Sequence, residues 1–221
     1  MHIPDGYLSP ATFSVGYLVA IPLWKKSFNH LKKTLNEETL PLIASLSALS
    51  FVIMMFNIPI PGGTSGHAIG AALISILFNP WIGFLSVSLV LLIQAVIFGD
   101  GGISTFAINA LSMGFVASFS ASFIMKLNIN TKYKYFLAGW FSAVASSMIV
   151  AFALGIQPYI ATDSSGKPLF FPFDLMTTFY ALVGSHILFF GVVEGVFTHF
   201  AYKFLTKLEP KFIEQQTINQ G

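Results

Sequence analysis

The chain begins MHIPDG, which places a histidine directly after the terminal amino group. The amine of Met1, the backbone nitrogen of His2 and the ring Nδ1 of His2 can bind one metal ion together, because they close two small chelate rings. A second histidine, His67, ends the glycine-rich stretch 60–67, IPGGTSGH. A ring nitrogen of His67 would complete a square of four nitrogens, which suits Ni(II) or Cu(II) and suits zinc poorly.

The same two histidines also allow a purely structural interpretation, in which His2 is a disordered terminal residue and His67 caps a helix. The metal hypothesis makes stricter demands on the chain. Pro4 and Gly6 would let the N-terminal segment 1–6 fold back sharply, and metal binding would release protons and weaken as the pH falls. We take Met1 as the mature terminus, because the first apolar stretch lacks the positively charged leading region of a signal peptide.

Other polar residues lie within or near apolar segments. Gln94 could hold a metal-bound imidazole by a hydrogen bond, and Asn109 and Ser112 share one helix face. The alternative is that these residues join helices by hydrogen bonds, as is common in membrane bundles. His186 is either a functional group or a structural hydrogen-bond partner, and the depth of Glu194 argues against direct metal capture.

The composition indicates that a membrane must surround these residues. Of 221 residues, 55% are hydrophobic and 9% are charged, with a mean hydropathy of +0.76, whereas about 25% of the residues in a soluble domain are charged. Without arginine, phosphate or nucleic-acid binding has no support. Without cysteine, disulfides, thiolate catalysis and cysteine-based metal sites are excluded.

We therefore predict an all-α integral membrane protein, a compact bundle of about seven transmembrane helices that forms one domain over residues 1–221. Apolar runs of about 17–25 residues are long enough to cross a bilayer. Fusing the third and fourth runs, which Asn79-Pro80 separates, would give six. The expected spans are 7–24, 40–59, 67–79, 81–98, 104–125, 135–156 and 174–206.

The lysines orient these spans. With seven spans, ten of the eleven lysines fall on one side and only Lys167 falls on the other, whereas six spans would divide them. The positive-inside rule then places the N-terminus outside the cell and the C-terminus in the cytoplasm, so segments 1–6 and 60–67 share the outer face. The ten lysines are Lys25, Lys26, Lys32, Lys33, Lys126, Lys132, Lys134, Lys203, Lys207 and Lys211.

Five stretches, in order along the chain from residue 1 to about 195, together resemble the CbiM/NikM family. They are MHIPDG, GGTSGHAIGAAL, LFNPW, QAVIFGDGGISTFAINALSMG and GSHILFFGVVEG. Members of this family are the substrate-capture (S) components of energy-coupling-factor transporters for cobalt and nickel. The resemblance implies about seven helical spans and a Co(II) or Ni(II) site formed by the terminal amine, the His2 amide and ring, and His67.

The resemblance also implies partners. Family members hand the ion to a transmembrane coupling subunit and two ATP-binding subunits, and some work with a small accessory membrane subunit. This chain ends without a fused extension, so we expect the accessory subunit to be separate. Ala44 and Ala48 resemble the AxxxA pattern that contacts the coupling subunit, and small residues four apart do let helices approach closely. The chain departs from the family at Asp100, where members often carry histidine.

The leading hypothesis is thus a capture subunit of the plasma membrane for Ni(II) or Co(II), without an organic cofactor or catalysis of its own. The chain has no Walker motif, so another subunit would hydrolyse ATP. One alternative is a self-sufficient secondary metal transporter, which would need carboxylates along an intramembrane path. A metal-dependent membrane enzyme would need an open coordination position and a nearby base.

Overall fold

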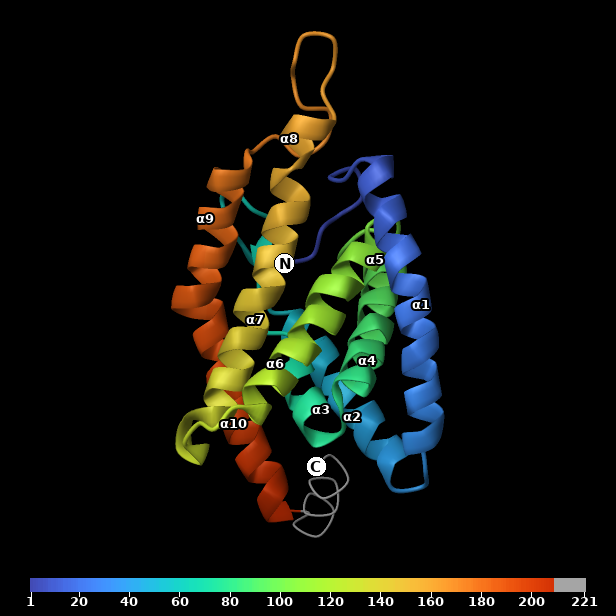
Figure 1. The fold of residues 1–221 in the computed structure, drawn as a ribbon, viewed down its shortest axis with the longest axis vertical. Helices are drawn as coiled ribbons and strands as arrows, with labels where there is room; N and C mark the ends of the chain where they lie inside the picture. The colour runs from blue at the N-terminus through green and yellow to red at the C-terminus, as the bar shows by residue number, and fades with distance from the viewer. Residues whose placement is uncertain (209–221) are drawn as a thin grey trace.

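The computed structural model describes residues 1–208, and these residues form a bundle of long helices around short irregular segments (Figure 1). Four continuous helical segments are long and apolar enough to cross a membrane: Pro80–Phe98, Phe106–Lys126, Thr131–Ile160 and Leu175–Leu208. The prediction of a helical membrane protein is confirmed, whereas the count of seven transmembrane helices is not. Lys211 lies outside the described residues.

The helices have these bounds. They are α1 (Pro10–Thr34), α2 (Thr39–Met54), α3 (Ala71–Leu77), α4 (Pro80–Ile93), α5 (Phe106–Asn109), α6 (Ala117–Lys126), α7 (Thr131–Gly155), α8 (Gln157–Ile160), α9 (Leu175–Ser185) and α10 (Gly191–Leu208). Three segments are π-helical. Gln94–Phe98 continues α4, Ala110–Val116 joins α5 to α6, and His186–Phe190 joins α9 to α10.

Side-chain caps explain where several helices begin. The Asn79 carboxamide accepts hydrogen bonds from the backbone N–H groups of Trp81 and Ile82, both at 3.0 Å, ahead of Pro80 at the first helical position. The Asp174 carboxylate accepts from the N–H of Thr177 at 2.7 Å. Such caps satisfy backbone donors that have no partner within the helix, so the sequence fixes these boundaries locally.

The predicted span 67–79 is wrong as a transmembrane helix. Only Ala71–Leu77 is helical, and seven residues rise about 10 Å, against a hydrocarbon core of about 30 Å. The preceding residues are extended: β1 (Ile58–Pro59) pairs with β2 (Ser65–Gly66) in an antiparallel hairpin. Gly70 has a positive φ of 79°, which separates this hairpin from α3. We call residues 58–70 the strap.

Two other expected boundaries also differ from the structure. The first helix continues ten residues beyond the predicted end at 24, because lysines are good helix formers and favour the C-terminal end of a helix. The second ends at Met54 rather than 59, where the chain turns into the extended pair Ile58–Pro59. Both changes leave the candidate ligands outside these helices.

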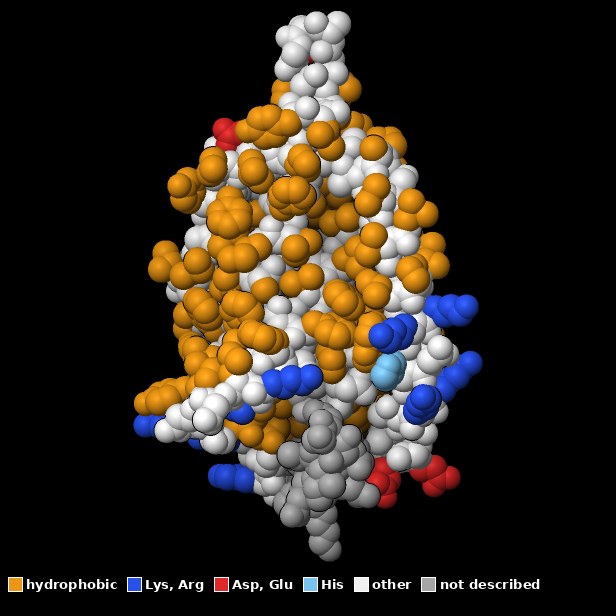
Figure 2. Space-filling view, viewed as in Figure 1, with side chains coloured by type: hydrophobic (Ala, Val, Ile, Leu, Met, Phe, Trp, Pro, Cys, Tyr) orange, Lys and Arg blue, Asp and Glu red, His pale blue; other side chains and the backbone are white. Residues whose placement is uncertain are grey.

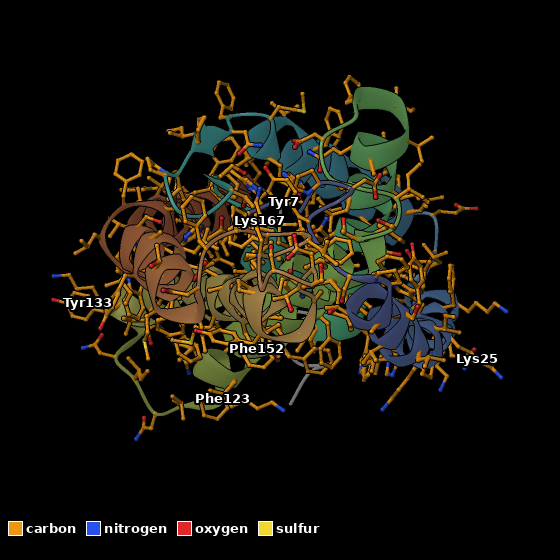
Figure 3. All side chains as sticks on the ribbon, turned by 90° about the horizontal axis from the view of Figure 1, so that it is seen from above. Tyr7, Lys25, Phe123, Tyr133, Phe152 and Lys167 are labelled. Carbon is orange, nitrogen blue, oxygen red and sulfur yellow. The ribbon has the colours of Figure 1, made fainter. Side chains whose placement is uncertain are left out.

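The surface separates apolar from charged regions. In Figure 2, hydrophobic side chains cover most of the visible face, and lysines gather at the end of the molecule where Figure 1 marks the C-terminus. Figure 3 looks down on the end of the molecule opposite these lysines; the exposed residues Tyr7 and Lys167 project over the middle of this view, while Lys25 lies at its edge. This distribution agrees with the expected grouping of the lysines, and the sidedness in a membrane stays a prediction.

Candidate metal centre

The first three residues of the chain belong to the interior. Met1 and Ile3 are fully buried and join the main hydrophobic core, and only 4% of His2 is exposed. The amine of Met1 donates to the carbonyl oxygen of Ser65 at 2.5 Å and contacts the Ser65 hydroxyl at 3.0 Å. The N-terminus therefore docks onto the strap, two residues before His67. His2 is not a disordered terminal residue.

Asn109 holds the N-terminal segment through its backbone. The Asn109 carboxamide accepts from the N–H of Ile3 at 3.0 Å and donates to the carbonyl oxygen of Ile3 at 3.0 Å. Gly102 N–H and the Thr105 hydroxyl donate to the same carbonyl. Ile3 is thus held much like a residue in a β-sheet, and this fixes the backbone direction at the neighbouring His2.

A second attachment lies nearer to solvent. The exposed carboxylate of Asp5 accepts from the backbone N–H groups of Ile103 and Ser104, at 3.1 and 2.8 Å, and from the Ser104 hydroxyl. These hydrogen bonds lower the pKa of Asp5, with the Ser104 hydroxyl as the main cause. The N-terminal segment is therefore joined to residues 102–109 at two depths.

Hydrogen bonds assign the tautomer of His2. Its Nε2 lies 3.2 Å from the carboxamide oxygen of Gln94, which can only accept. The proton consequently resides on Nε2, and Nδ1 carries a lone pair. That Nδ1 lies 3.2 Å from a carboxylate oxygen of Asp100 without the geometry of a hydrogen bond. The lone pair of Nδ1 and the negatively charged oxygen of Asp100 therefore lie close together, and a cation could bind to both.

His67 lies against His2. The two rings stack with centroids 4.6 Å apart and an interplanar angle of 22°. Nδ1 of His67 donates to the carbonyl oxygen of Ala68 at 3.0 Å, so Nε2 carries the lone pair. This Nε2 is buried and has no hydrogen-bond partner within residues 1–208. The structure therefore brings together the three residues that the sequence predicts as metal ligands.

Burial leaves these nitrogens without protons at neutral pH. Desolvation lowers the pKa of the Met1 amine to about 4, although the negative charge of Asp100 opposes the shift. Desolvation and the nearby amine lower the pKa of His2 to about 3, and the same causes place the pKa of His67 well below its usual value. Metal ligands must be deprotonated, so the lone pairs of all three groups are already available.

Few side chains of the types that bind metals lie close together in the described part of the chain. Among residues 1–208, no group of three or more His, Asp or Glu side chains could hold an ion, and the chain has no cysteine. The amine of Met1 lies beside this pair of imidazoles, because it binds Ser65, two residues before His67. A planar set of four such nitrogens would suit Ni(II).

The remaining residues singled out in the sequence make contacts outside the candidate ligand set. The Ser112 hydroxyl donates to the carbonyl of Asn109 at 3.1 Å, within its own helix. His186 donates from Nδ1 to the carbonyl of Leu182 at 2.7 Å, which is the structural hydrogen bond that one interpretation proposed. Ala44 and Ala48 are exposed on α2, away from the N-terminal segment.

Sequence reasoning missed several residues that shape the centre. Ser65 accepts the amine, and Thr105 and Asp5 hold the N-terminal segment. Gln157 accepts from the N–H of Ser9 at 2.9 Å. Three candidate polar residues, Gln94, Ser112 and His186, lie in the π-helical segments. Such segments occur frequently at functional sites, but the sequence carries no recognisable signal for them.

The comparison with known families decides the family of this chain. The family described as the cobalt uptake substrate-specific transmembrane region, CbiM, matches residues 2–212. The chain belongs to the CbiM family. The resemblance to CbiM/NikM proteins inferred from the five sequence stretches is confirmed.

Two curated relatives illustrate the range of the CbiM family. The fused nickel transport protein NikMN of Rhodobacter capsulatus is 38% identical over 96% of this chain, which spans 64% of that longer protein. A putative metal transport protein of Methanocaldococcus jannaschii is 38% identical, over 95% of this chain and 93% of the relative. Both matches therefore extend over nearly the whole of this chain.

Two solved structures of transition metal transporters share this fold. A crystal structure of a truncated transition metal transporter is 37% identical, with a TM-score of 0.90 over 94% of this chain and 99% of that one. A crystal structure of a transition metal transporter is 36% identical, with a TM-score of 0.91 over 96% and 95%.

Proposed function

We propose that this chain is the substrate-capture subunit of a transporter that imports Ni(II) or Co(II). The ion would be bound by the amine of Met1, the backbone nitrogen and Nδ1 of His2, and Nε2 of His67. One observation carries the proposal: the amine of Met1 is buried beside two stacked imidazoles whose lone pairs lack protein donors. The CbiM description and the nickel transport names of relatives support the same substrate.

Asp100 gives the bound ion a balanced charge in this proposal. A divalent ion with one deprotonated amide has a net charge of +1, and the carboxylate of Asp100, 3.2 Å from Nδ1 of His2, would neutralise it. Buried charges are costly unless they are paired. Two ligands at right angles, each about 2.0–2.2 Å from an ion, are about 3 Å apart, so the same oxygen is placed to approach the ion directly.

Gln94 and Asn109 would support the ligands without binding the ion. Gln94 orients the ring of His2, and Asn109 orients its backbone through Ile3. Outer partners of this kind fix the tautomer and direction of metal-binding histidines. For Ser112, whose hydrogen bond stays within its own helix, the proposal is limited to support of the Asn109 carbonyl.

The lysine distribution supports an orientation in the plasma membrane with the metal site on the extracytoplasmic side and the C-terminus in the cytoplasm. Transport would then require partners: a transmembrane coupling subunit, two ATP-binding subunits and, as in some relatives, a small accessory membrane subunit. Ala44 and Ala48 line an apolar groove of about 560 Å³ between α1, α2 and α4. This groove is where we propose that the coupling subunit packs.

The experiment is a titration of the purified chain with Ni(II), compared with a variant that carries one added residue before Met1. The added residue converts the amine into an amide and fills the place of the amine, so tight binding should be abolished without unfolding. His67→Ala should lose the fourth nitrogen, while His30→Ala, at the opposite end of α1, is the matched control and should bind normally. Equal binding by the extended chain would reject the amine as a ligand.

A further inference from the structure

One charged side chain in the interior has no role in the proposed ligand set. Glu194 lies on α10, within the membrane-spanning segment Leu175–Leu208, and is completely buried. An ionisable residue inside a membrane protein is costly and usually has a specific partner. Within residues 1–208, Glu194 is the one fully buried acidic residue.

The partners of Glu194 are backbone groups of the strap. One carboxylate oxygen accepts from the N–H of Ile69 at 2.6 Å, and the other accepts from the N–H of Gly70 at 2.9 Å. These two N–H groups come immediately after His67 and Ala68 in the chain. Glu194 therefore holds the strap at the point where it turns from His67 into α3.

The same turn is held from the opposite direction. The hydroxyl of Ser50 on α2 donates to the carbonyl oxygen of Ile69 at 2.6 Å. Both backbone groups of Ile69 are thus hydrogen-bonded, its carbonyl to Ser50 on α2 and its N–H to Glu194 on α10. A Cβ added to Gly70 would make an ordinary contact with Ser50 at 3.4 Å, so the reason for glycine here is the positive φ.

The other side of His67 is fixed by packing. A Cβ added to Gly66 would lie 2.0 Å from the ring of Phe190, in the π-helical segment that leads into α10. His67 is therefore fixed on both sides: Gly66 before it packs on Phe190, and Glu194 binds the N–H groups of Ile69 and Gly70 after it. Both contacts come from the segment His186–Leu208.

We infer that Glu194 is a positioning residue for His67, whose Nε2 it keeps directed at the metal site by holding the strap. This inference rests on the proposed function. Two N–H donors converge on the side chain, and a carboxylate accepts from both because it has only acceptors. A carboxamide would direct its own NH₂ group at one of the donors, so the conservative replacement Glu194→Gln should disturb the strap without changing its size.

The test is a Ni(II) titration of Glu194→Gln in the full chain. We expect binding of one ion with affinity reduced by roughly 10–100-fold, the range for groups that orient metal ligands. The visible absorption of bound Ni(II) should shift towards that of His67→Ala, because the fourth nitrogen is displaced. A general loss of folding would lower the fraction of competent protein instead of altering this spectrum.

A double-mutant comparison separates positioning from a structural role. In a His67→Ala background, Glu194→Gln should cause no further loss of affinity, because its effect acts through His67. An equal loss in both backgrounds, or wild-type affinity in the single variant, would overturn the inference. Glu194→Asp, which keeps the charge and shortens the side chain, carries the same comparison if the glutamine variant does not fold.

The two proposals fail in distinguishable ways. If neither the extension before Met1 nor His67→Ala changes Ni(II) binding, the proposed function fails. If both variants lose binding but Glu194→Gln retains wild-type affinity and spectrum, only the inference about Glu194 fails. Ser50→Ala should weaken binding in the same direction as Glu194→Gln, because it releases the other side of Ile69.

Discussion

The two segments that carry the candidate nitrogen ligands are held in different ways. The N-terminal segment 1–6 is attached mainly through its own backbone and Asp5 to residues 102–109, with Asp5 in solvent. The strap is attached in the interior, through Glu194 and Ser50, and packs on α9 through Gly62 and Gly63. Both segments reach the interior, but only the N-terminal segment begins at a chain end and has an attachment in solvent.

This difference suggests a division of labour at the centre. A fixed imidazole presents one ligand in a constant position, which favours precise metal geometry. In the proposed function the N-terminal segment would supply the remaining three nitrogens, and its His2 contacts Gln94 and Asp100, which follow the C-terminal end of α4. In the proposed function, capture and release would involve movement of the N-terminal segment more readily than movement of the strap.

The largest expected effect is the loss of stability caused by replacing a glycine of the strap. Gly66→Ala places a Cβ 2.0 Å from the ring of Phe190, and overpacking of this severity should cost about 3 kcal/mol of stability. It should also displace His67 and weaken Ni(II) binding. Thermal unfolding and metal titration of the purified variant measure both consequences.

Gly6→Ala is the matched variant in the N-terminal segment. Its Cβ would meet nothing within 4 Å, and its only cost is the positive φ of 84°, about 1 kcal/mol. A larger loss of stability in Gly6→Ala than in Gly66→Ala would show that the N-terminal segment, not the strap, is the more tightly integrated of the two.

A smaller effect is expected from Asn109→Ala. The variant leaves the buried N–H of Ile3 unpaired, whereas the carbonyl keeps Gly102 and Thr105 as donors, and an unpaired buried group costs about 1–3 kcal/mol. Because the cost falls on the docked terminus, Ni(II) affinity should drop roughly 10–100-fold while the thermal transition of the bundle changes little. Isothermal titration and thermal unfolding of the same sample give both numbers.

Ser112→Ala provides the control on the same helix face. Its hydroxyl bonds only to the Asn109 carbonyl in the described structure, so we expect near-normal Ni(II) affinity. If Ser112→Ala weakens binding as much as Asn109→Ala, the carboxamide contacts with Ile3 are not what positions the terminus.

The sequence predicted that the three candidate ligands lie close together, which the structure shows, but not how they are held. Lysine counting and span parity predicted Met1, His2 and His67 on the outer face of the membrane, and that sidedness stays a prediction. The same reasoning treated 67–79 as a helix, since its residues are apolar. The extended strap depends on tertiary contacts, chiefly Glu194, which lies 125 residues from Ile69.

The contacts of Glu194 and Asn109 show why the sequence could not predict how the candidate ligands are held. Both side chains satisfy backbone groups of distant segments, and no local periodicity marks which amide a buried carboxylate or carboxamide will bind. The π-helical segments at Gln94 and His186 are similarly decided by packing. Capped helix starts, such as Asn79-Pro80, could be predicted because every contact is local.

The smallest signal tests whether the N-terminal segment is docked before metal arrives. With the pKa of the buried amine lowered to about 4, that of His2 lowered to about 3 and that of His67 well below its usual value, these groups have no protons to release at pH 7. Ni(II) should therefore displace only the amide proton of His2, about one proton per ion. The affinity for Ni(II) should then fall about tenfold for each unit by which the pH is lowered. Isothermal titration in buffers of different ionisation enthalpy counts this proton.

An undocked terminus would give a different count. A solvated amine has a pKa near 8.0 and is mostly protonated at pH 7, so binding would release nearly two protons per ion. Asn109→Ala, which frees the segment, should move the count from about one towards two while Ser112→Ala leaves it at one. A count near two in the unmodified chain would mean that the metal itself draws the terminus into the bundle, and that the strap is the only ligand segment formed in advance.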